Sequence, residues 1–559
     1  MRKIVLGFDF GTLSCRGVAV DLQSGVRVAQ SQCDYAHGVI AGCLPDGGPD
    51  LPDSWFLQDP DDWMNSLTAV CRDMLTQGGI MPEEVTALGI DFTSCTLVPI
   101  KADGTPLCTL EAYRRRPHAW PKLWKHHGAQ KQADRIEALA REETDWLSSH
   151  FGNSVSSEWA YPKMMQVAEE APDIYEAADY FIEAVDYIPM VLTGRILRNN
   201  GVLGVNAFYI EGRGYPDETF AAKLNPLMRH VAEDKLAGEI GRVGDAVGCV
   251  RPEMAVRLGI TDKVVVSVGN SDGAVAGCGV GANESGTMML VMGTSTCHQF
   301  MYRDFHSFDG LCSIAADGMV PGLYGYESGQ SATGDIFAWY VDSMAPESVT
   351  KAAAEAGLSP LEYLGREAEK LLPGECGLMG LDWLNGNRSI LSNYDLSGCL
   401  LGLTLNTSPV EIYRALVEAN IYGSRRILDN YEENGITIST IFGVGGIAVK
   451  CPWIMQMCAD VFNKPVRVPL HDNVPALGSA ATAAVALFKS GDEDGCDGFG
   501  EAASRLIPGE AVVYEPDPFK AALYRPVYEL YRTLHDLFGV ENSLMKELRA
   551  LKHNAVSMK

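Results

Sequence analysis

The chain has 559 residues, 47% of them hydrophobic, and carries a formal net charge of −27. This length predicts more than one domain of ordinary globular composition. A charge this negative argues against nucleic acid and against an anionic membrane as partners.

Targeting and redox signals in the sequence predict a cytoplasmic protein. Asp9 interrupts the first apolar run too early for a signal peptide, and no run of 18 apolar residues suggests a membrane span. The fifteen cysteines are scattered without a Cys-x-x-Cys pair, which is typical of reduced thiols. No cluster of cysteine and histidine has the spacing of zinc ligands.

The first predicted element is a β-hairpin, with an apolar strand over residues 4–8 and a returning strand over residues 16–20. Gly11 is expected to supply the backbone freedom of the tight turn. A tip that combines free N–H groups with Asp9 and the hydroxyl of Thr12 suits a polyphosphate and its metal ion. Taken alone, the pattern fits an ordinary hairpin turn equally well.

A helix is predicted to begin at Asp59, and a buried strand is predicted over residues 85–92. The strand is followed by small polar residues that include Ser94 and Cys95. Ligands bind at strand ends of α/β sheets, so we expect a ligand here. A polar strand cap is the alternative.

The middle of the first half contains a basic and aromatic segment, residues 114–130, and several predicted core helices. Because the segment is short and isolated in an acidic chain, we interpret it as the wall of a sugar or anion pocket rather than as a nucleic-acid site. The helices are expected at residues 136–147, 162–178, 184–192 and 252–258. The glycine-rich residues 201–214 are expected to form a loop near a cleft.

Asp272 is the candidate general base. It follows a predicted strand over residues 264–268, inside a Gly-Asn-Ser-Asp-Gly turn close to the middle of the chain. A sugar kinase needs one carboxylate within hydrogen-bond reach of the accepting hydroxyl. A helix N-cap is the competing interpretation, since aspartate is favoured there. A helix is expected over residues 274–278, and the crossing into the second half near Gly281.

The Gly-Thr hairpin signal occurs a second time. A strand over residues 289–292 runs into Gly293 and Thr294, and Gly11, Thr12 and Cys15 fall onto Gly293, Thr294 and Cys297 at one constant offset of 282. An offset of half the chain predicts a duplicated domain. Two facing hairpins would hold the phosphates of one nucleotide across a cleft.

The rest of the second half is predicted to be mainly helical, with one glycine-rich strand end. A loop is expected over residues 324–331, and helices over residues 353–371, 409–431, 451–462, 476–487 and, as a surface element, 528–551. A strand over residues 437–442 opens Gly443-x-Gly445-x-x-Ala448, a loose dinucleotide fingerprint. We interpret it as glycines lying against a nucleotide base and ribose. Neither a P-loop nor a protein-kinase signature occurs.

Together these stretches resemble the FGGY family of carbohydrate kinases over nearly the whole chain. The resemblance implies an actin-like ATPase (ribonuclease H-like) α/β fold, with two similar domains around a cleft for ATP and sugar. The division implied is residues 1–280 for the N-terminal domain and residues 281–559 for the C-terminal, ATP-binding domain with its helical tail.

The resemblance also implies roles for individual residues. Asp272 falls on the catalytic aspartate of the family, and Asp9 on the residue that meets Mg²⁺, directly or through water. The cofactor-binding set implied for ATP is Asp9, Gly11, Thr12, Ser14, Gly293, Thr294, Ser295, Gly445, Gly446 and Lys450. The sugar-binding set implied is Ser94, Cys95, Asn206, Asp272 and Glu327.

Three segments, residues 89–96, 116–130 and 325–331, are similar to the branch of the family that phosphorylates L-ribulose. Two positions depart from that branch. Its usual Gly-His-Lys-Ala is Gly204-Val205-Asn206-Ala207 here, so Asn206 stands where a sugar-contacting lysine is expected. Ser94 replaces what is commonly alanine.

The implied reaction is transfer of the γ-phosphoryl group of MgATP to a terminal hydroxyl of a ketopentose, in the first place L-ribulose, in arabinose catabolism. A kinase for another ketose or polyol, such as D-ribulose or D-xylulose, is the near alternative. A catalytically silent ATP-binding sugar sensor is the distant one. Nucleic acid and membrane are not expected as partners, and a homodimer is an open expectation.

Overall fold

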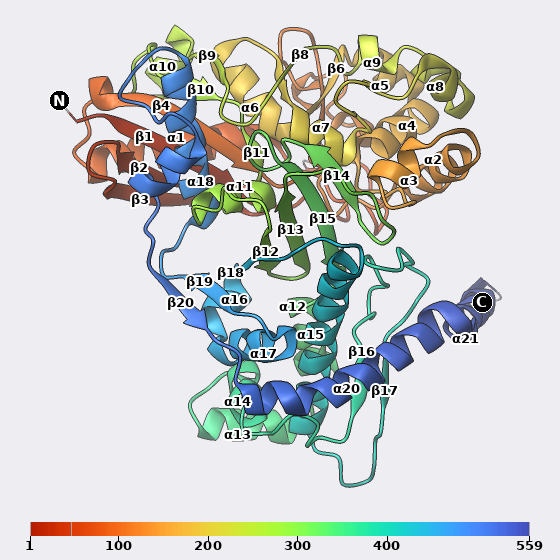
Figure 1. The fold of residues 1–559 in the computed structure, drawn as a ribbon. Helices are drawn as coiled ribbons and strands as arrows, with labels where there is room; N and C mark the ends of the chain where they lie inside the picture. Colours follow the sequence, from red (N-terminus) through yellow and green to blue (C-terminus); the bar gives the residue numbers. More distant parts are fainter. Residues whose placement is uncertain (1, 46, 558–559) are drawn as a thin grey trace.

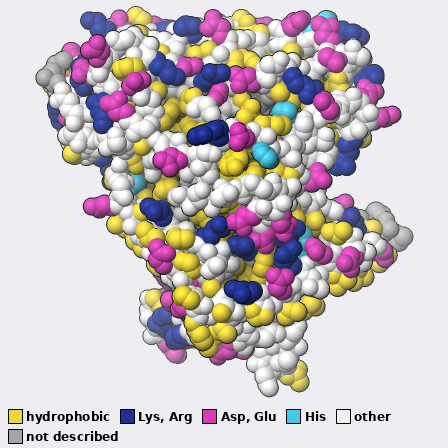
Figure 2. Space-filling view, viewed as in Figure 1, with side chains coloured by type: hydrophobic (Ala, Val, Ile, Leu, Met, Phe, Trp, Pro, Cys, Tyr) yellow, Lys and Arg dark blue, Asp and Glu magenta, His cyan; other side chains and the backbone are white. Residues whose placement is uncertain are grey.

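The computed structural model describes residues 2–45 and 47–557, which form two lobes, each built on a seven-stranded sheet (Figure 1). In Figure 2, acidic and basic side chains are interspersed over the face that is drawn. Among the helices of the described residues, none is long and apolar enough to cross a membrane.

The first sheet has the order β3-β2-β1-β4-β10-β9, with β11 also pairing with β4. Its strands are β1 (Ile4–Phe10), β2 (Ser14–Asp21), β3 (Arg27–Asp34), β4 (Val85–Phe92), β9 (Ala246–Cys249), β10 (Val265–Ser267) and β11 (Asn270–Ser271). Strands β1, β2 and β3 are antiparallel neighbours, whereas β4 and β10 continue the sheet in parallel with β1.

The second sheet repeats this pattern in the order β14-β15-β13-β12-β18-β19-β20. Its strands are β12 (Thr287–Met292), β13 (Thr296–Tyr302), β14 (Ser313–Ala316), β15 (Tyr324–Gln330), β18 (Thr440–Val444), β19 (Val466–Pro469) and β20 (Ala511–Tyr514). Strands β12, β13 and β15 are antiparallel, and β18 and β19 follow in parallel. The repeat of strand order agrees with the duplication expected from the two hairpins.

The two hairpin turns differ by one residue. Phe10 pairs with Cys15 across a turn of four residues, whereas Met292 pairs with Thr296 across a turn of three. The constant offset of 282 is therefore wrong beyond the turn, and Cys15 corresponds to Thr296 rather than to Cys297. The expectation for Gly11 is also wrong, because its φ is not left-handed. The absence of a side chain there leaves the tip open instead.

Helices cover both sheets and extend the first lobe. Those of the first half are α1 (Pro60–Gln77), α2 (Gln130–Glu143), α3 (Trp146–His150), α4 (Ala160–Glu170), α5 (Pro172–Ala177), α6 (Ala184–Thr193), α7 (Asn200–Asn206), α8 (Glu218–Leu224), α9 (Val231–Asp234), α10 (Pro252–Leu258) and α11 (Asp272–Gly279). Those of the second half are α12 (Gly334–Trp339), α13 (Glu347–Glu355), α14 (Pro360–Ala368), α15 (Pro409–Glu433), α16 (Gly446–Lys450), α17 (Pro452–Phe462), α18 (Val474–Lys489), α19 (Phe499–Leu506), α20 (Pro518–Asp536) and α21 (Leu544–Ser557). Three small sheets pair β5 (Leu97–Ile100) with β6 (Tyr180–Glu183), β7 (Leu197–Asn199) with β8 (Glu239–Gly241), and β16 (Met379–Leu381) with β17 (Cys399–Leu401).

Three expected loop or surface segments differ from the structure. Residues 200–206 form helix α7, which is capped by the Asn199 side chain rather than being a loop. Residues 324–330 form strand β15 inside the second sheet, because their small residues allow close pairing with β13 and β14. Helix α20 is not a mere surface element, since Tyr528 and Tyr531 are buried against the core of the second lobe.

Helix α18 packs against the first sheet although it lies late in the sequence. A Cβ at Gly7 of β1 would lie 1.9 Å from the carbonyl oxygen of Ala476, and one at Gly89 of β4 would lie 2.0 Å from that of Ser479. Small residues on both sides therefore bring helix and sheet into backbone contact. In Figure 1 the blue α18 lies beside β1 and β4 in the upper lobe. The division at residues 280 and 281 stays a prediction, and α18 packs across it.

Candidate active site

Three acidic residues lie at the ends of adjacent parallel strands in the first lobe. Asp9 of β1 is in register with Asp91 of β4, which is in turn in register with Asn270 of β11. Asp272 follows β11 directly, as the first residue of α11. The sheet thus gathers three carboxyl groups at one edge, where ligands bind in α/β folds.

Asp9 is 4% exposed, and its Oδ2 accepts a hydrogen bond of 3.2 Å from Nη1 of Arg16. Burial raises the pKa of Asp9, and the positive charge of Arg16 opposes that rise. Arg16 faces Asp9 across the hairpin because the two residues are paired in the β1–β2 register. The hairpin itself therefore supplies the counter-ion of this carboxylate.

Asp91 is fully buried, and its Oδ2 accepts a hydrogen bond of 2.7 Å from the hydroxyl of Ser479 in α18. Its Oδ1 has no hydrogen-bond partner among the described residues. Burial, and next the negative charge of Asp9, hold the pKa of Asp91 well above its usual value.

Asp272 begins α11, and its Oδ1 accepts a hydrogen bond of 2.7 Å from the backbone N–H of Gly273. The N-cap position belongs to Ser271, so the N-cap interpretation of Asp272 is wrong. Burial raises the pKa of Asp272 to about 7, and the negative charges of Asp9 and Glu327 add to the rise. A carboxylate with this pKa can accept and release a proton near neutral pH.

A narrow cavity of about 10 Å³ lies between the lobes near Asp272. It is lined by Ser94, Gly201, Val202, Val205, Asn270, Ser271, Ala274, Gln299, Gly318, Met319, Gly325, Tyr326 and Glu327. Ser94 and Glu327 were expected to contact a sugar, and the structure brings them to one cavity from different lobes. Ser271 and Ala274, which flank Asp272 in sequence, line the cavity, whereas Asp272 itself is not among the lining residues.

Cys95 and Asn206 lie behind this lining. Asn206 is fully buried in α7, where its Nδ2 lies 3.7 Å from Cys95 Sγ and its Oδ1 has no partner among the described residues. Cys95 Sγ lies 3.5 Å from the hydroxyl of Ser94, which does line the cavity. The neighbour Val205, rather than Asn206, faces the cavity. The ammonium group of buried Lys163 donates to the carbonyl of Cys95 at 2.6 Å.

The second hairpin lies beside the strand end that carries Gly445. Val291 of β12 is in register with Val444 of β18, so residues 293–295 and Gly445 emerge at the same edge of the second sheet. Gly445 has a φ of 94°, and a Cβ there would lie 2.5 Å from the carbonyl oxygen of Met292. Glycine is thus required at this position. A Cβ at Gly446 would meet nothing within 4 Å, which leaves backbone open to a ligand.

The second hairpin is anchored by the start of α12. The carbonyl of Thr294 accepts hydrogen bonds from the N–H groups of Thr333 and Asp335, at 2.7 and 3.2 Å. Gly293 and Thr294 are exposed, and so is Lys450 at the end of α16. Backbone N–H groups at such a tip are suited to phosphate oxygens.

Two side chains from other segments donate hydrogen bonds to the tip of the first hairpin, and the sequence alone did not predict these contacts. Gln58 Nε2 donates to the carbonyl of Thr12 at 2.8 Å, and Trp124 Nε1 donates to its hydroxyl at 3.1 Å. Ser14 is buried, so its hydroxyl does not lie on the open tip. Trp124 belongs to the basic segment 114–130, of which no described residue lines the cavity between the lobes.

The ligand atoms of Asp9, Asp91 and Asp272 do not gather into one three-residue metal site; among the described residues only the exposed Glu218, His230 and Glu233 do so. The neighbouring carboxyl groups of Asp9 and Asp91 nevertheless fit a hard divalent cation in kind, because such a cation prefers oxygen ligands. The unpartnered Oδ1 of Asp91 is the observation that favours this fit, since a buried carboxylate oxygen needs a partner. Asp9, on the hairpin, would hold such a cation near bound phosphates. A divalent cation there would offset negative charge on the phosphoryl groups.

Sequence reasoning missed Asp91, Gln299 and Arg388 as residues near the site. Asp91 was seen as part of a strand end but not as a partner of Asp9, because strand register was not known. Gln299 and Arg388 come from a strand and an irregular segment without a recognisable pattern. Their positions follow from tertiary packing alone.

Two family models match this chain. The FGGY family of carbohydrate kinases, N-terminal domain, matches residues 4–279, and the C-terminal domain of the same family matches residues 288–487. Ribulokinase of Geobacillus thermodenitrificans is 40% identical over 559 residues, which is 100% of this chain and 99% of the relative. Ribulokinase of Bacillus licheniformis is 42% identical over 541 residues, which is 97% and 98% of the two chains.

Solved structures share the fold. A ligand-bound xylulose kinase from Lactobacillus acidophilus superposes with a TM-score of 0.77 at 18% identity, covering 96% of this chain and 99% of its own. Glycerol kinase from Plasmodium falciparum with ADP superposes with a TM-score of 0.73 at 16% identity, covering 96% and 98%. The expected actin-like, ribonuclease H-like fold of two lobes is confirmed.

The fold, the cleft and these matches define a kinase that phosphorylates a carbohydrate. Kinases of this class use ATP as phosphate donor and typically a divalent metal. The chain belongs to the FGGY family of carbohydrate kinases.

Proposed function

We propose that the protein transfers the γ-phosphoryl group of MgATP to the terminal hydroxyl of L-ribulose and forms L-ribulose 5-phosphate in arabinose catabolism. The observation that carries this proposal is Asp272, a carboxyl group with its pKa raised to about 7 beside an inter-lobe cavity. The full-length identity of about 40% with ribulokinases supports the choice of sugar.

Asp272 accepts the proton of the attacking hydroxyl as the bond to phosphorus forms. Phosphoryl transfer depends mostly on positioning and on charge stabilisation, and a base in hydrogen-bond reach of the hydroxyl completes the alignment. Ser94 and Glu327 hold the ketose from opposite lobes. Cys95 and Asn206 support that wall from behind it.

ATP lies across the two hairpins in this proposal. The turn of Gly11, Thr12 and Ser14 on one side, and that of Gly293, Thr294 and Ser295 on the other, bind its phosphates. The N–H groups of Gly11 and Gly293 already close their own turns by donating to the carbonyls of Ser14 and Ser295, so other polar groups of the two turns contact the phosphates. Gly445, Gly446 and Lys450 bind the adenosine end. Mg²⁺ is the proposed metal, and Asp9 is its ligand, directly or through water.

Cellular context completes the proposal. The protein acts in the cytoplasm, its two domains meet near Gly281, and it is proposed to work as a homodimer. The cysteines of the described residues are all free thiols, which supports the cytoplasmic location. Size-exclusion chromatography with light scattering measures the oligomeric state.

The test is ADP release by the purified enzyme with MgATP and each of L-ribulose, D-ribulose, D-xylulose, a tetrulose and a polyol. L-Ribulose should give the highest kcat/KM. A higher value with another sugar would assign the enzyme to that sugar. Binding of ATP and ketose without ADP release would favour the sensor.

A further inference from the structure

Arg388 lies against the carboxylate of Glu327, one of the two side chains proposed to hold the ketose. Its Nη2 donates to Glu327 Oε1, and the two side chains are only 19% and 13% exposed. Its Nη1 lies 3.8 Å from Cys297 Sγ in β13. The guanidinium therefore lies over the strands that carry both Glu327 and the second Gly-Thr hairpin.

The segment that carries Arg388 is fastened to strand β15. The N–H of Gly329 donates to the hydroxyl of Ser389 at 3.1 Å. Asn387 and Asn393 exchange two backbone hydrogen bonds, of 2.9 and 2.7 Å, which close the loop between them. The backbone on both sides of Arg388 is thus held in place before any ligand binds.

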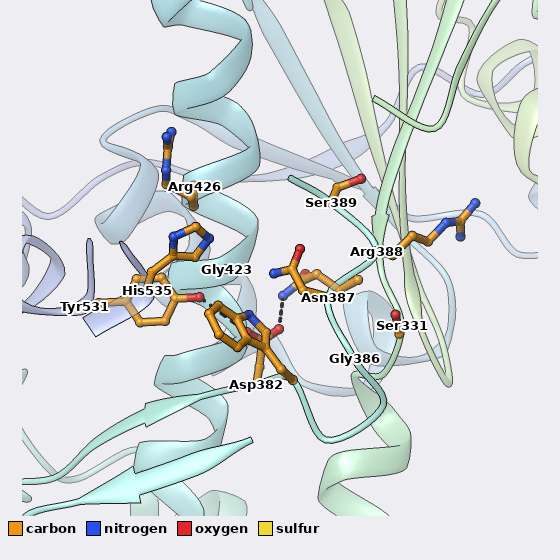
Figure 3. Close-up of a pocket in the computed structure, with 12 residues that line it drawn as sticks. Ser331, Asp382, Gly386, Asn387, Arg388, Ser389, Gly423, Arg426, Tyr531 and His535 are labelled. Carbon is orange, nitrogen blue, oxygen red and sulfur yellow. Dashed lines mark hydrogen bonds between the residues drawn. The ribbon is translucent and has the colours of Figure 1, made fainter. Parts of the chain in front are cut away.

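Figure 3 shows this segment at one polar pocket of the second lobe, which Asn387, Arg388 and Ser389 all line. The side chain of Asn387 lies on the side of the segment that faces Asp382 and Tyr531, and its Oδ1 accepts a hydrogen bond of 2.9 Å from the N–H of Leu391. The side chain of Arg388 leaves the segment on the opposite side. Its direction away from Asp382 leaves Glu327 as its carboxylate partner.

Gly329 leaves room for the guanidinium. A Cβ at this position would lie 3.3 Å from Arg388 Nη1 and 2.8 Å from the carbonyl oxygen of Thr296. A larger residue would push both the arginine and the neighbouring strand away. The packing of Arg388 against β15 therefore requires a glycine at position 329, which lies 59 residues earlier in the chain.

The negative charges around the cavity explain why a positively charged side chain stabilises this site. Asp9, Asp272 and Glu327 are all acidic, and the charge of Glu327 is among the causes that raise the pKa of Asp272. Arginine stays protonated and offers a rigid fork of donors, so it both offsets the charge of Glu327 and restricts its rotation.

We infer that Arg388 is a positioning residue for the sugar: it engages Oε1 of Glu327 and thereby leaves Oε2 turned toward the cavity to accept hydrogen bonds from ketose hydroxyls. The inference rests on the proposed function, since it deepens the role of Glu327 at the same site. Arg388 itself does not need to touch the sugar.

The test compares Arg388→Met, Arg388→Lys, Glu327→Gln and the double variant Glu327→Gln/Arg388→Met, with whichever sugar the wild-type enzyme phosphorylates best. Arg388→Met should raise KM for the sugar about 10- to 100-fold, as expected for loss of an ordered charged contact. KM for ATP should change less than about twofold, and Arg388→Lys should restore part of the affinity. The double variant should be no worse than Glu327→Gln alone, because Arg388 acts through Glu327.

Arg425→Met is the matched control. Arg425 is 20% exposed and pairs with Asp429 at 2.6 Å in the same lobe, on α15. Its loss should lower the melting temperature without changing KM for the sugar. This control separates loss of a half-buried ion pair from loss of sugar binding.

Three results would overturn the inference: an unchanged sugar KM in Arg388→Met, an equal rise in the KM for ATP, or additive losses in the double variant. If Arg388→Met fails to fold, Arg388→Lys takes its place, alone and combined with Glu327→Gln, and sugar binding measured calorimetrically without ATP decides the question. A wild-type enzyme that phosphorylates no ketopentose would refute the proposed function but not this coupling, which is measured with the accepted sugar.

Discussion

At the scale of single residues, the site is a set of acids whose protonation depends on burial. The sheet register places Asp9 beside Asp91, and Asp272 follows the next strand. Each of the three carboxyl groups has a raised pKa, with burial as the largest cause. Of the three, Asp272 has a pKa of about 7 and can exchange a proton near neutral pH.

Asp272→Asn should leave the fold and ATP binding intact and lower kcat. Removal of a general base typically costs about 10²- to 10⁴-fold in rate. The control is Asp460→Asn, a buried aspartate in α17 away from the cavity, which should keep its kcat. An Asp272→Asn enzyme with more than about a third of wild-type kcat would contradict the assignment.

The pH dependence follows from the raised pKa of Asp272. Its folded-state pKa is about 7, so the protonated, inactive form dominates below this value and the basic form above it. We therefore expect kcat/KM to rise as pH increases through about 7, or through a lower pH when a bound cation stabilises the carboxylate. Initial rates at fixed ionic strength check this. A profile that falls over the same range would have the wrong sign for a base.

Asn206→Lys tests the departure from the ribulose-phosphorylating branch. A lysine here can extend past Cys95 and Ser94, which connect the buried amide to the cavity. Its ammonium group should lower KM for L-ribulose more than KM for D-ribulose or D-xylulose, by roughly 10-fold for one charged hydrogen bond. Asn206→Met, long but uncharged, is the control. Equal effects on the KM of all three sugars would show that the residue at position 206 does not discriminate between them.

At the scale of elements, close contact between α18 and the first sheet holds the site together. Ser479 on α18 donates to Asp91, and the neighbouring backbone contacts leave no room for side chains at Gly7 and Gly89. Hydrophobic residues of β1, β2, α11 and α18 form one shared core cluster. The carboxyl group of Asp91 is thus oriented by an element 388 residues away in sequence.

Gly7→Ala should destabilise the enzyme strongly. The added methyl group would lie 1.9 Å from the carbonyl oxygen of Ala476, so helix and sheet must separate, and overpacking of this kind costs typically about 1–3 kcal/mol or more. Thermal denaturation measures the loss. Gly509→Ala is the matched control, because a Cβ there meets nothing within 4 Å. Equal melting temperatures for both variants would refute the packing argument.

The sequence predicted the strands and helices with clear periodicity, including β1, β4, α1 and α15, and the duplicated hairpins. It failed where small residues were taken as signs of a loop. Residues 200–206 and 324–330 are ordered because glycines there allow close approach to a neighbouring element, as when a Cβ at Gly201 would lie 2.7 Å from Gly318 Cα. The partners of Asp91 and Glu327 could not be predicted, since register and long-range packing set them.

At the scale of the whole molecule, the cavity lies between the two lobes, and we predict that these lobes move relative to one another when ligands bind. Ser94 and Glu327 approach it from opposite sides, so a ligand that contacts both should draw the lobes together. Small-angle scattering with L-ribulose and a non-hydrolysable ATP analogue should give a smaller radius of gyration than the free enzyme. An unchanged radius, with binding verified by calorimetry, would contradict closure about the predicted hinge near Gly281.

The position of α18 also has a consequence for biosynthesis. The face of the first sheet that α18 covers is made from β1 (Ile4–Phe10) and β4 (Val85–Phe92), which are translated well before α18 (Val474–Lys489). Until most of the chain has left the ribosome, that face has no native cover and exposes apolar strand residues. We therefore expect the first lobe to complete its folding only after α18 has been translated, and the unfinished intermediate to be prone to aggregation until then.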